Sequence, residues 1–270
     1  MLIDIDFTGR HVAVFGGTSG INLGVAEGFA RRGARLSVVS RSATKVAAAC
    51  RQLGGNAHGA CADVRDMAAV QAACAGAAAR FGPIDVLVSG AAGNFPASAS
   101  ALSSNGFRAV VDIDLLGTFH VARAAYPHLR KPGASVINIS APQAVIPMRY
   151  QAHVCAAKAG VDQLTRVLAL EWGAVGVRVN AISPGPIRGT EGVRKLIGDT
   201  DQALAQIAAR VPLARLGEAE DIANLALFLA SPYAGYLSGA VIACDGGGAI
   251  DGIKDLLEAA AGRAAAPPPG

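Results

Sequence analysis

No stretch of this chain is apolar for the roughly 18 residues that a membrane span requires, although 52% of its 270 residues are hydrophobic. The amino-terminal stretch from Met1 to Arg10 is acidic and lacks the basic segment, followed by an apolar one, that marks a secretion signal. Positive charge is sparse as well, because the formal net charge is only +4 and Lys and Arg are scattered. We therefore expect no membrane insertion, no secretion and no nucleic-acid partner.

Cysteine is scarce and follows no pairing pattern. The five cysteines contain no CxxC motif, and an odd number cannot all pair within one chain. We interpret them as reduced thiols, and we predict a cytoplasmic protein without a bound metal ion. The absence of a Ser-Lys-Leu address at the end of the chain also favours the cytoplasm over the peroxisome.

Short apolar segments alternate with longer alanine-rich ones along most of the chain. The predicted strands are His11 to Phe15, Arg35 to Val39, Ile84 to Ser89, Ala134 to Ile139, Val177 to Ile182 and Ala240 to Cys244. The predicted helices are Gly20 to Arg32, Ala43 to Leu53, Met67 to Phe81, Asn105 to Leu129, Ala152 to Trp172 and Glu218 to Leu229. This alternation predicts an α/β fold with a single Rossmann-type, doubly wound parallel sheet and helices on both faces. We expect one dinucleotide-binding domain over residues 1–258 and a disordered Ala- and Pro-rich tail over 259–270.

A glycine-rich turn follows the first predicted strand and opens the first helix. It runs from Gly16 to Gly24 with the sequence GGTSGINLG. Backbone amides and the helix dipole at such a turn hold a pyrophosphate, so we predict a nucleotide cofactor there. The predicted contacts are Gly16, Thr18, Ser19, Gly20 and Ile21.

The end of the second strand indicates which cofactor is used. An NAD enzyme usually places Asp or Glu there to bind the adenosine ribose, but this chain has Arg41, with Lys45 one turn later. A guanidinium fits a 2′-phosphate, so we predict NADP(H) rather than NAD(H). Asp63, after the third strand segment, is a candidate acceptor for the adenine amino group or, alternatively, a helix cap.

Together these motifs resemble the short-chain dehydrogenase/reductase superfamily from Val12 to Gly247. The resemblance is carried by the glycine turn, Ala91-Ala92-Gly93, Asp114-Leu115-Leu116-Gly117, Lys158 and Pro184-Gly185. Within it the chain is similar to the 2,4-dienoyl-CoA reductases, particularly the peroxisomal type and its bacterial relatives. That narrower match rests on AAGNF at 91–95, on Asp112-Ile113-Asp114 followed by Gly117-Thr118-Phe119, and on PGPIRGTEG at 184–192.

The resemblance implies further cofactor contacts, and the chain also departs from the family pattern. The implied contacts are Val64, Ala91, Gly93, Lys158, Pro184, Gly185, Ile187 and Thr190. Asn22 stands in place of the third glycine of the turn, Phe15 in place of the preceding threonine, and Gly90 in place of the asparagine before Ala91-Ala92-Gly93. A side chain at Asn22 is expected to crowd the helix against the strand and to weaken cofactor binding.

Two hydroxyl groups of the superfamily are absent. Val154 occupies the position of the catalytic tyrosine, four residues before Lys158, and Ala141 occupies that of the serine. Neither can deliver a proton, which disfavours alcohol–ketone chemistry and favours reduction of a carbon–carbon double bond. In the peroxisomal reductases an aspartate and the helix lysine act through a water, and the resemblance assigns these catalytic roles to Asp114 and Lys158.

The same resemblance implies an acyl-CoA substrate of lipid breakdown. It places Arg41, Arg65, Phe95 and Lys195 at substrate-contacting positions and Ser103 in a substrate loop, and the segment from Arg188 to Arg210 is expected to form a lid. The Ala243-Cys244-Asp245-Gly246-Gly247 stretch resembles a segment near subunit interfaces, which implies a homotetramer. Two alternatives stay open: a reductase of another enone or acyl thioester, and a catalytically silent NADP-binding protein.

Overall fold

A seven-stranded sheet organises the computed structural model, which describes residues 5–197 and 200–250, without the side chains of 195–197. The order is β3-β2-β1-β4-β5-β6-β7, and every neighbouring pair is parallel. The strands are β1 (His11–Phe15), β2 (Arg35–Ser40), β3 (Ala57–Cys61), β4 (Val86–Ser89), β5 (Ser135–Ile139), β6 (Arg178–Pro184) and β7 (Val241–Cys244). The predicted tail over 259–270 lies outside the described residues.

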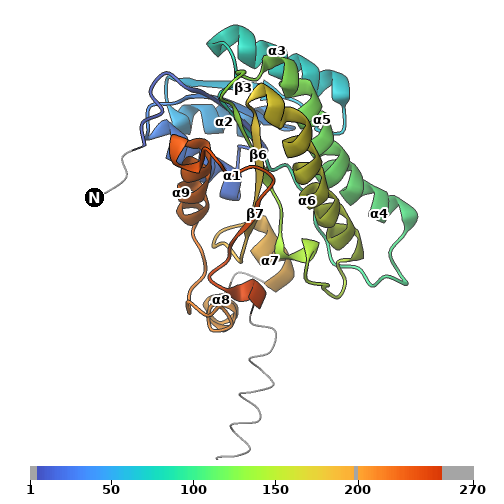
Figure 1. Ribbon diagram of the computed structural model, residues 1–270. Helices are drawn as coiled ribbons and strands as arrows, with labels where there is room; N and C mark the ends of the chain where they lie inside the picture. Colours follow the sequence, from blue (N-terminus) through green and yellow to red (C-terminus); the bar gives the residue numbers. More distant parts are fainter. Residues whose placement is uncertain (1–4, 198–199, 251–270) are drawn as a thin grey trace, which may run out of the picture.

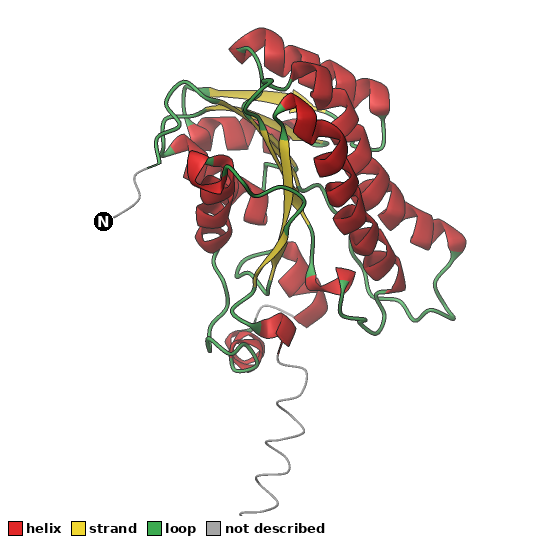
Figure 2. Ribbon diagram, viewed as in Figure 1, coloured by secondary structure: helices red, strands yellow, loops and turns green. Residues whose placement is uncertain are grey.

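Helices cover both faces of the sheet, as Figures 1 and 2 show. One face carries α1 (Gly20–Ala30), α2 (Ala43–Leu53) and α9 (Ala219–Ala230), and the other carries α3 (Met67–Phe81), α4 (Ser104–Val111), α5 (Gly117–Ala125) and α6 (Ala152–Trp172). Two short helices, α7 (Glu191–Ile197) and α8 (Asp201–Ala208), lie beyond the carboxyl ends of the strands, within the predicted lid. The predicted doubly wound fold is confirmed. No helix in the described ranges is long and apolar enough to cross a membrane.

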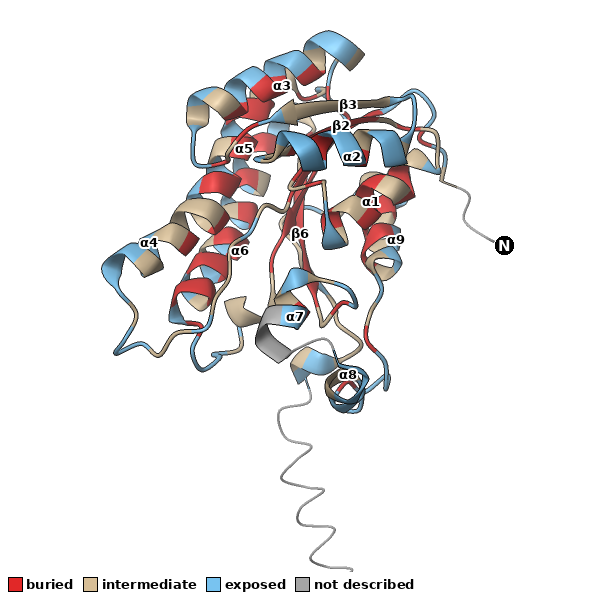
Figure 3. Cartoon of the chain, turned by 180° about the vertical axis from the view of Figure 1, so that it is seen from behind, coloured by how far each residue is buried: buried red, intermediate tan, exposed pale blue. Residues whose placement is uncertain are grey.

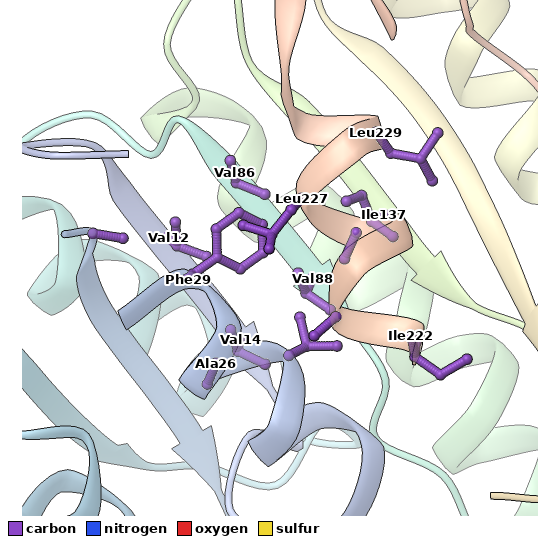
Figure 4. Close-up of a cluster of buried hydrophobic side chains, with 14 of the residues drawn as sticks. Val12, Val14, Ala26, Phe29, Val86, Val88, Ile137, Ile222, Leu227 and Leu229 are labelled. Carbon is purple, nitrogen blue, oxygen red and sulfur yellow. The ribbon is translucent and has the colours of Figure 1, made fainter. Parts of the chain in front are cut away.

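The hydrophobic core forms two layers, one on each face of the sheet. On the α1 and α9 face, Phe29 and Leu227 pack over Val12 and Val86, as Figure 4 shows. On the other face, α3, α5 and α6 pack against the same strands. The helices bury their inner sides and expose their outer sides, which Figure 3 shows from behind. Because apolar burial lies on both faces, the strands read as continuous apolar runs rather than alternating ones.

The strand order reverses between β1 and β4, which pair directly in register from Val12 with Val86 to Phe15 with Ser89. The chain goes outward from β1 to β2 and β3, and then returns to β4 on the other side of β1. The chain after β1 therefore enters α1 on one face of the sheet, and the chain after β4 leads to α4 on the other face. In doubly wound sheets, the crevice at this reversal is where ligands bind.

Two elements differ from the sequence prediction. The third strand, β3, pairs with β2; a strand segment was expected before Asp63 but no range was predicted for it, because HGA at its centre lacks the apolar pattern of a buried strand. The single helix predicted from Asn105 to Leu129 is interrupted by a π-helical segment, Asp112–Leu116, and ends in a 3₁₀ turn, Tyr126–His128. Local interruptions of this kind leave no mark in the 3.6-residue periodicity.

At the amino end of the sheet, a buried carboxylate joins the strands far from the crevice. Asp85 accepts hydrogen bonds from the His11 backbone N–H at 2.8 Å, from Arg10 at 3.0 Å and from Arg130. Burial opposes ionisation of Asp85, but the Arg130, His11 and Arg10 donors outweigh it and lower its pKa. The His11 ring, hydrogen-bonded to Gly82 O and to Ser37 Oγ, is neutral because burial lowers its pKa.

Replacing Asp85 with Asn preserves the shape of the side chain and removes its charge. At pH 7 we expect the free energy of unfolding to fall by about 2 kcal/mol, because two guanidinium groups lose a charged acceptor. Since the folded-state pKa of Asp85 lies below its unfolded value of about 4, the loss is full above that pH and shrinks as the pH falls further.

Urea unfolding at pH 7 and near pH 3 measures this difference. The exposed Glu171 provides the control, because Glu171→Gln removes a carboxylate at the surface and is expected to change stability by no more than about 0.5 kcal/mol. An equal loss for Asp85→Asn at both pH values would contradict the assignment.

Candidate active site

The loops that leave β1 and β4 touch each other at the crevice. Gly16 has a φ of 78° and donates its N–H to Val39 O at 2.8 Å. A Cβ at Gly16 would lie 2.9 Å from the Ala91 nitrogen, so only glycine fits between the two loops. Ser19 is exposed and precedes α1 without capping it through its side chain, and Thr18 and Ile21 are half-buried. The Ser19 side chain thus leaves the first-turn amides of α1 uncapped, as a pyrophosphate site requires.

A charged cluster lies at the carboxyl ends of β2 and β3. Arg65 forms a bidentate pair with Asp63, with Nη2 at 2.6 Å from Oδ2 and Nε at 3.0 Å from Oδ1. Arg41 Nη1 lies 4.0 Å from the same carboxylate and is exposed, as is Lys45. The Arg65 hydrogen bond lowers the pKa of Asp63. Because Arg65 neutralises Asp63, the cluster keeps one excess positive charge at Arg41, which suits an anionic ligand.

In this cluster, two predicted ligand contacts, Arg65 and Asp63, have different neighbours from those expected. Arg65, predicted to bind substrate, lies beside the predicted cofactor residue Arg41 at the β2–β3 edge. Asp63, predicted to accept from adenine, already accepts from Arg65 with both oxygens. Val64 is buried and its carbonyl accepts a hydrogen bond from His120 at 2.9 Å. The loop from Asp63 to Arg65 is therefore anchored from α5 as well as by its own ion pair.

The π-helical segment places Asp114 inside the protein. Asp114 is 1% exposed, and its Oδ1 accepts the Gly93 backbone N–H at 2.7 Å. Its Oδ2 lies 3.2 Å from Lys158 Nζ but outside hydrogen-bond geometry, and no other described group donates to it. Lys158, on α6 and 6% exposed, donates to Ile139 O at 3.0 Å. The structure therefore brings the two predicted catalytic residues together, with one carboxylate oxygen free to accept a further hydrogen bond.

The neighbours of this pair offer no replacement for the missing hydroxyl groups. Val154 is 4% exposed and packs in a small apolar cluster with Val110 and Ala157. Ser140, next to Ala141, donates its hydroxyl to the buried Asp162 carboxylate. Burial raises the pKa of Asp162, and the Ser140 hydrogen bond only partly opposes this. The Ser140 hydroxyl is thus already committed to a structural contact, as is the Thr118 hydroxyl, which donates to Asp114 O at 2.6 Å.

His153 is fully buried and is not hydrogen-bonded to any described residue. Its ring packs on Phe95, with centroids 4.5 Å apart and planes at 59°. Tyr150, in contrast, is 59% exposed and has a φ of 65°, and its carbonyl accepts the Ala97 N–H at 3.0 Å. His153 and Tyr150 therefore hold the segment after β4 against the start of α6.

The predicted substrate loop forms one wall of a groove. Phe95 packs under α4, where a Cβ at Gly106 would lie 3.2 Å from its ring, and Gln151 donates to its carbonyl at 3.4 Å. Ser103 caps α4 by accepting the Gly106 N–H at 3.1 Å. A groove of about 560 Å³ is lined by Ala99, Leu102, Ser103, Ser104, Phe107, Arg108, Val111 and Ala152. The predicted substrate residue Lys195 lies on α7, and its side chain is outside the described part of the structure.

The turn after β6 closes the crevice from the third side. Ile187 is buried, and its carbonyl accepts the Thr190 hydroxyl at 2.8 Å. A Cβ at Gly20 would lie 3.7 Å from Thr190 Cγ2, so this turn faces the start of α1. Pro184 and Gly185 lie at the end of β6 beside the residues that follow β7. Residues predicted to bind the cofactor thus converge from the ends of β1, β4 and β6.

The sequence analysis did not find the contact made by Asn22 or the interruption of the helix at Asp112–Leu116. Asn22 Nδ2 donates to Gly90 O at 2.7 Å, which links the two cofactor loops. The signal for this contact was present, since both positions depart from the family pattern. Within residues 5–197 and 200–250, no group of three or more His, Cys, Asp or Glu side chains is placed to hold a metal ion.

Residues 16–248 match the profile of a protein family described as Enoyl-(Acyl carrier protein) reductase. The chain is 44% identical over 239 residues to the peroxisomal 2,4-dienoyl-CoA reductase [(3E)-enoyl-CoA-producing] of Pongo abelii, across 87% of this chain and 82% of that relative. It is 39% identical over 244 residues to the probable 2,4-dienoyl-CoA reductase [(2E)-enoyl-CoA-producing] of Bacillus subtilis, across 88% of this chain and 96% of that relative.

A solved structure shares the fold over nearly the whole chain. A short chain dehydrogenase from Bacillus anthracis superimposes with a TM-score of 0.79 at 35% identity, over 89% of this chain and 96% of the other. The overall fold is therefore shared with a protein of related sequence.

The cysteines allow the position of the cofactor to be tested without an activity assay. Cys61 is exposed at the end of β3 and donates its thiol to Arg41 O at 3.1 Å, whereas burial raises the pKa of Cys74 to about 12. We expect iodoacetamide to modify Cys61 at least about 100-fold faster than Cys74. Saturating NADP⁺ is expected to slow the modification of Cys61, because the adenosine phosphate would cover it.

Peptide mapping by mass spectrometry over a time course measures both rates. Cys50, half-buried on α2 against β3, is the internal control, since its modification should not respond to NADP⁺. Equal rates at Cys61 with and without bound NADP⁺ would place the adenosine elsewhere.

Proposed function

The chain belongs to the short-chain dehydrogenase/reductase family, and from this premise we propose that it reduces a conjugated 2,4-dienoyl-CoA thioester to an enoyl-CoA with NADPH. Two relatives whose names state this activity, from a vertebrate and from a bacterium, support the substrate class. The observation that carries the proposal is the buried pair of Asp114 and Lys158 beside Val154, where a hydroxyl donor is missing. Ketone reduction requires a donor placed at the carbonyl oxygen, whereas a conjugated thioester is protonated at carbon.

The residues at the crevice fit nicotinamide adenine dinucleotide phosphate. Gly16 leaves the space that a Cβ would fill against Ala91, and the first-turn amides of α1 are open to a pyrophosphate. The exposed guanidinium of Arg41 is free for a 2′-phosphate, because Arg65 already satisfies Asp63. Lys158 has a rigid position through Ile139 O and can also hydrogen-bond a nicotinamide ribose.

Reduction of the diene adds a hydride and a proton. When bound, the nicotinamide cofactor supplies the hydride to the diene carbon farthest from the thioester. Negative charge then accumulates on the thioester enolate, and Asp114 and Lys158 hold a water that protonates the carbon next to the thioester. Asp114 Oδ2, which accepts no hydrogen bond from the described residues, orients this water. The Lys158 ammonium stabilises the hydroxide left behind until solvent reprotonates it.

This proton position has a consequence for the product. Protonation next to the thioester leaves the remaining double bond between the third and fourth carbons, as in the name of the vertebrate relative. The bacterial relative is named for the other isomer. Nuclear magnetic resonance of the product separates the two.

A substrate panel separates this proposal from its alternatives. With NADPH, dienoyl-CoA esters of several chain lengths should lose their diene absorbance, while free enones and simple ketones should not react. Turnover of free enones in preference to dienoyl-CoA would indicate a different reductase. Binding of NADPH without turnover of any conjugated thioester would indicate a silent cofactor-binding protein.

Replacing Asp114 with Asn removes the charge that faces Lys158 and retains the side-chain shape. We expect kcat for dienoyl-CoA to fall by at least about 100-fold, because the water loses its charged acceptor and the Lys158 ammonium loses its partner. The KM for NADPH should change by less than about threefold, since Asp114 contacts the substrate side of the site. Initial rates from diene absorbance measure both constants.

Asp112 is the matched control for this prediction. It lies in the same π-helical segment but is only half-buried, so Asp112→Asn should retain activity. An Asp114→Asn enzyme with undiminished kcat would remove Asp114 from the mechanism.

Replacing Arg41 with Ala tests the cofactor choice. We expect the KM for NADPH to rise by about 10- to 100-fold while the KM for NADH changes little, because only NADPH carries the 2′-phosphate. Arg65→Ala is expected to act in the same direction, since it leaves the Asp63 carboxylate uncompensated near that phosphate. Steady-state kinetics with both cofactors provide the measurement, with the exposed Arg51→Ala on α2 as control. Parallel increases for NADPH and NADH would contradict the assignment.

A further inference from the structure

The four-residue segment from Gly90 to Gly93 is held at both ends by side chains from separate elements. At its start, Gly90 O accepts a hydrogen bond from Asn22 Nδ2 at 2.7 Å. At its end, the Gly93 N–H donates to Asp114 Oδ1 at 2.7 Å. Asn22 belongs to the first turn of α1, and Asp114 to the π-helical segment on the opposite face of the sheet. The segment therefore links the cofactor loop to the buried ion pair.

Asn22 and Gly90 occupy one shared space. A Cβ at Gly90 would lie 2.3 Å from Asn22 Oδ1, 2.4 Å from Nδ2 and 2.7 Å from Cγ. These distances are too short for any real contact, so Asn22 can adopt this position only because residue 90 has no side chain. Asn22 is the residue predicted to crowd α1 against the sheet, and in the structure its side chain lies against Gly90 and donates to the Gly90 carbonyl.

The hydrogen bond from Asn22 has a fixed direction. The Gly90 carbonyl can only accept, so the amide nitrogen of Asn22 must face it. The Asn22 side chain is 8% exposed, and its Oδ1 is buried without a hydrogen-bond donor among the described residues. A buried acceptor without a partner is unfavourable. The Asn22 side chain is therefore held in place by the hydrogen bond that its Nδ2 donates to Gly90 O, and this donor is the group to test.

We propose that Asn22 is a positioning residue for the reaction. Its hydrogen bond to Gly90 O fixes where the Gly90–Gly93 segment lies relative to α1. Through the Gly93 N–H, the segment then sets the orientation of the Asp114 carboxylate toward Lys158. Asp114 Oδ1 is fixed by Gly93, so a shift of that N–H turns Oδ2 relative to Lys158 Nζ, which lies 3.2 Å away. This inference rests on the proposed function only where it refers to dienoyl-CoA turnover. The coupling between Asn22 and the segment is independent of the substrate.

Two substitutions separate the donor from the shape of the side chain. Asn22→Ala removes both, and Asn22→Asp retains the shape but cannot donate to Gly90 O when ionised. We expect kcat for dienoyl-CoA to fall by about tenfold or more in both variants, with a dissociation constant for NADPH within about threefold of wild type. The pH profile of kcat should also shift, because the environment of Asp114 changes. Asn224→Ala, at an exposed position of α9, is the matched control and should behave as wild type.

A double substitution tests the shared space directly. Gly90→Ala alone should lower the melting temperature and weaken NADPH binding, because its Cβ meets the Asn22 amide. Asn22→Gly/Gly90→Ala should recover both properties but not kcat, since the donor is still missing. Gly90→Ala with wild-type stability and NADPH binding would overturn the steric part of the inference.

Hydrogen exchange supplies a readout that needs no substrate. In Asn22→Ala, backbone amides of the segment 90–93 should exchange faster than in wild type, measured by mass spectrometry on peptides that cover β4 and this segment. If wild type fails to reduce any dienoyl-CoA but this exchange still accelerates, the proposed function is wrong and the coupling stands. If exchange, kcat and the pH profile all match wild type in Asn22→Ala and Asn22→Asp, the inference is wrong. If only the affinity for NADPH changed, Asn22 would be a cofactor contact and not a positioning residue, and the inference would likewise be wrong.

Discussion

The carboxyl edge of the sheet depends on keeping one ammonium and one carboxylate side by side, almost without access to water. Removing both charges from solvent is unfavourable, and their attraction offsets this only when the remaining donors and acceptors are also satisfied. Lys158 meets this condition through Ile139 O at the end of β5, and Asp114 meets it at Oδ1 through the Gly93 N–H after β4, while Oδ2 has no hydrogen-bond donor among the described residues. The pair therefore ties together the ends of two strands, the long helix α6 and the π-helical segment. A change in any of these elements alters the pair.

Charge is used differently at the two ends of the crevice. Arg41 and Arg65 are exposed and Asp63 is half-buried, so their interactions with one another are weakened by solvent and salt, and Arg41 stays available to an incoming anion. Asp114 and Lys158 are buried, so solvent and salt weaken their electrostatic interaction much less. An exposed cluster suits reversible binding of a charged ligand, whereas a buried pair suits the control of a proton. The fold separates these tasks, because the exposed cluster follows β2 and β3 whereas the buried pair lies on the π-helical segment and α6.

The sequence predicted most of the fold because the relevant signals are local. The apolar strands and the glycine turn after Phe15 can each be recognised from a few consecutive residues. Parallel βαβ units have a fixed handedness, so few sheet topologies are compatible with them. The pairing of Asp114 with Lys158 was predicted from the family resemblance, not from spacing. The bounds of strand β3 were not predicted, because its side chains are half-buried or exposed and it carries no apolar run.

The contact between Asn22 and Gly90 was beyond prediction from the sequence, although both residues had been noted as unusual. Its partners are 68 residues apart, and their meeting depends on how closely α1 approaches the loop after β4. The burial of His153 against Phe95 is of the same kind, since it depends on how the segment after β4 folds back onto α6. Such long-range contacts depend on how the elements pack together, and the sequence of a short segment carries no information about that packing.

The wide turn at Asp112–Leu116 has a consequence for how this site can change over evolution. A π turn contains more residues than an α turn, so it changes the direction in which side chains after the turn point relative to those before it. Val110 before the turn faces α6, and Val121 after it faces the sheet core, while Asp114 between them points to Lys158. The apolar contacts on either side of the reacting position are thereby made without Asp114, although Gly93 and Lys158 still contact its carboxylate. A change of the residue at 114 would therefore alter the buried pair and leave the packing of Val110 and Val121 in place.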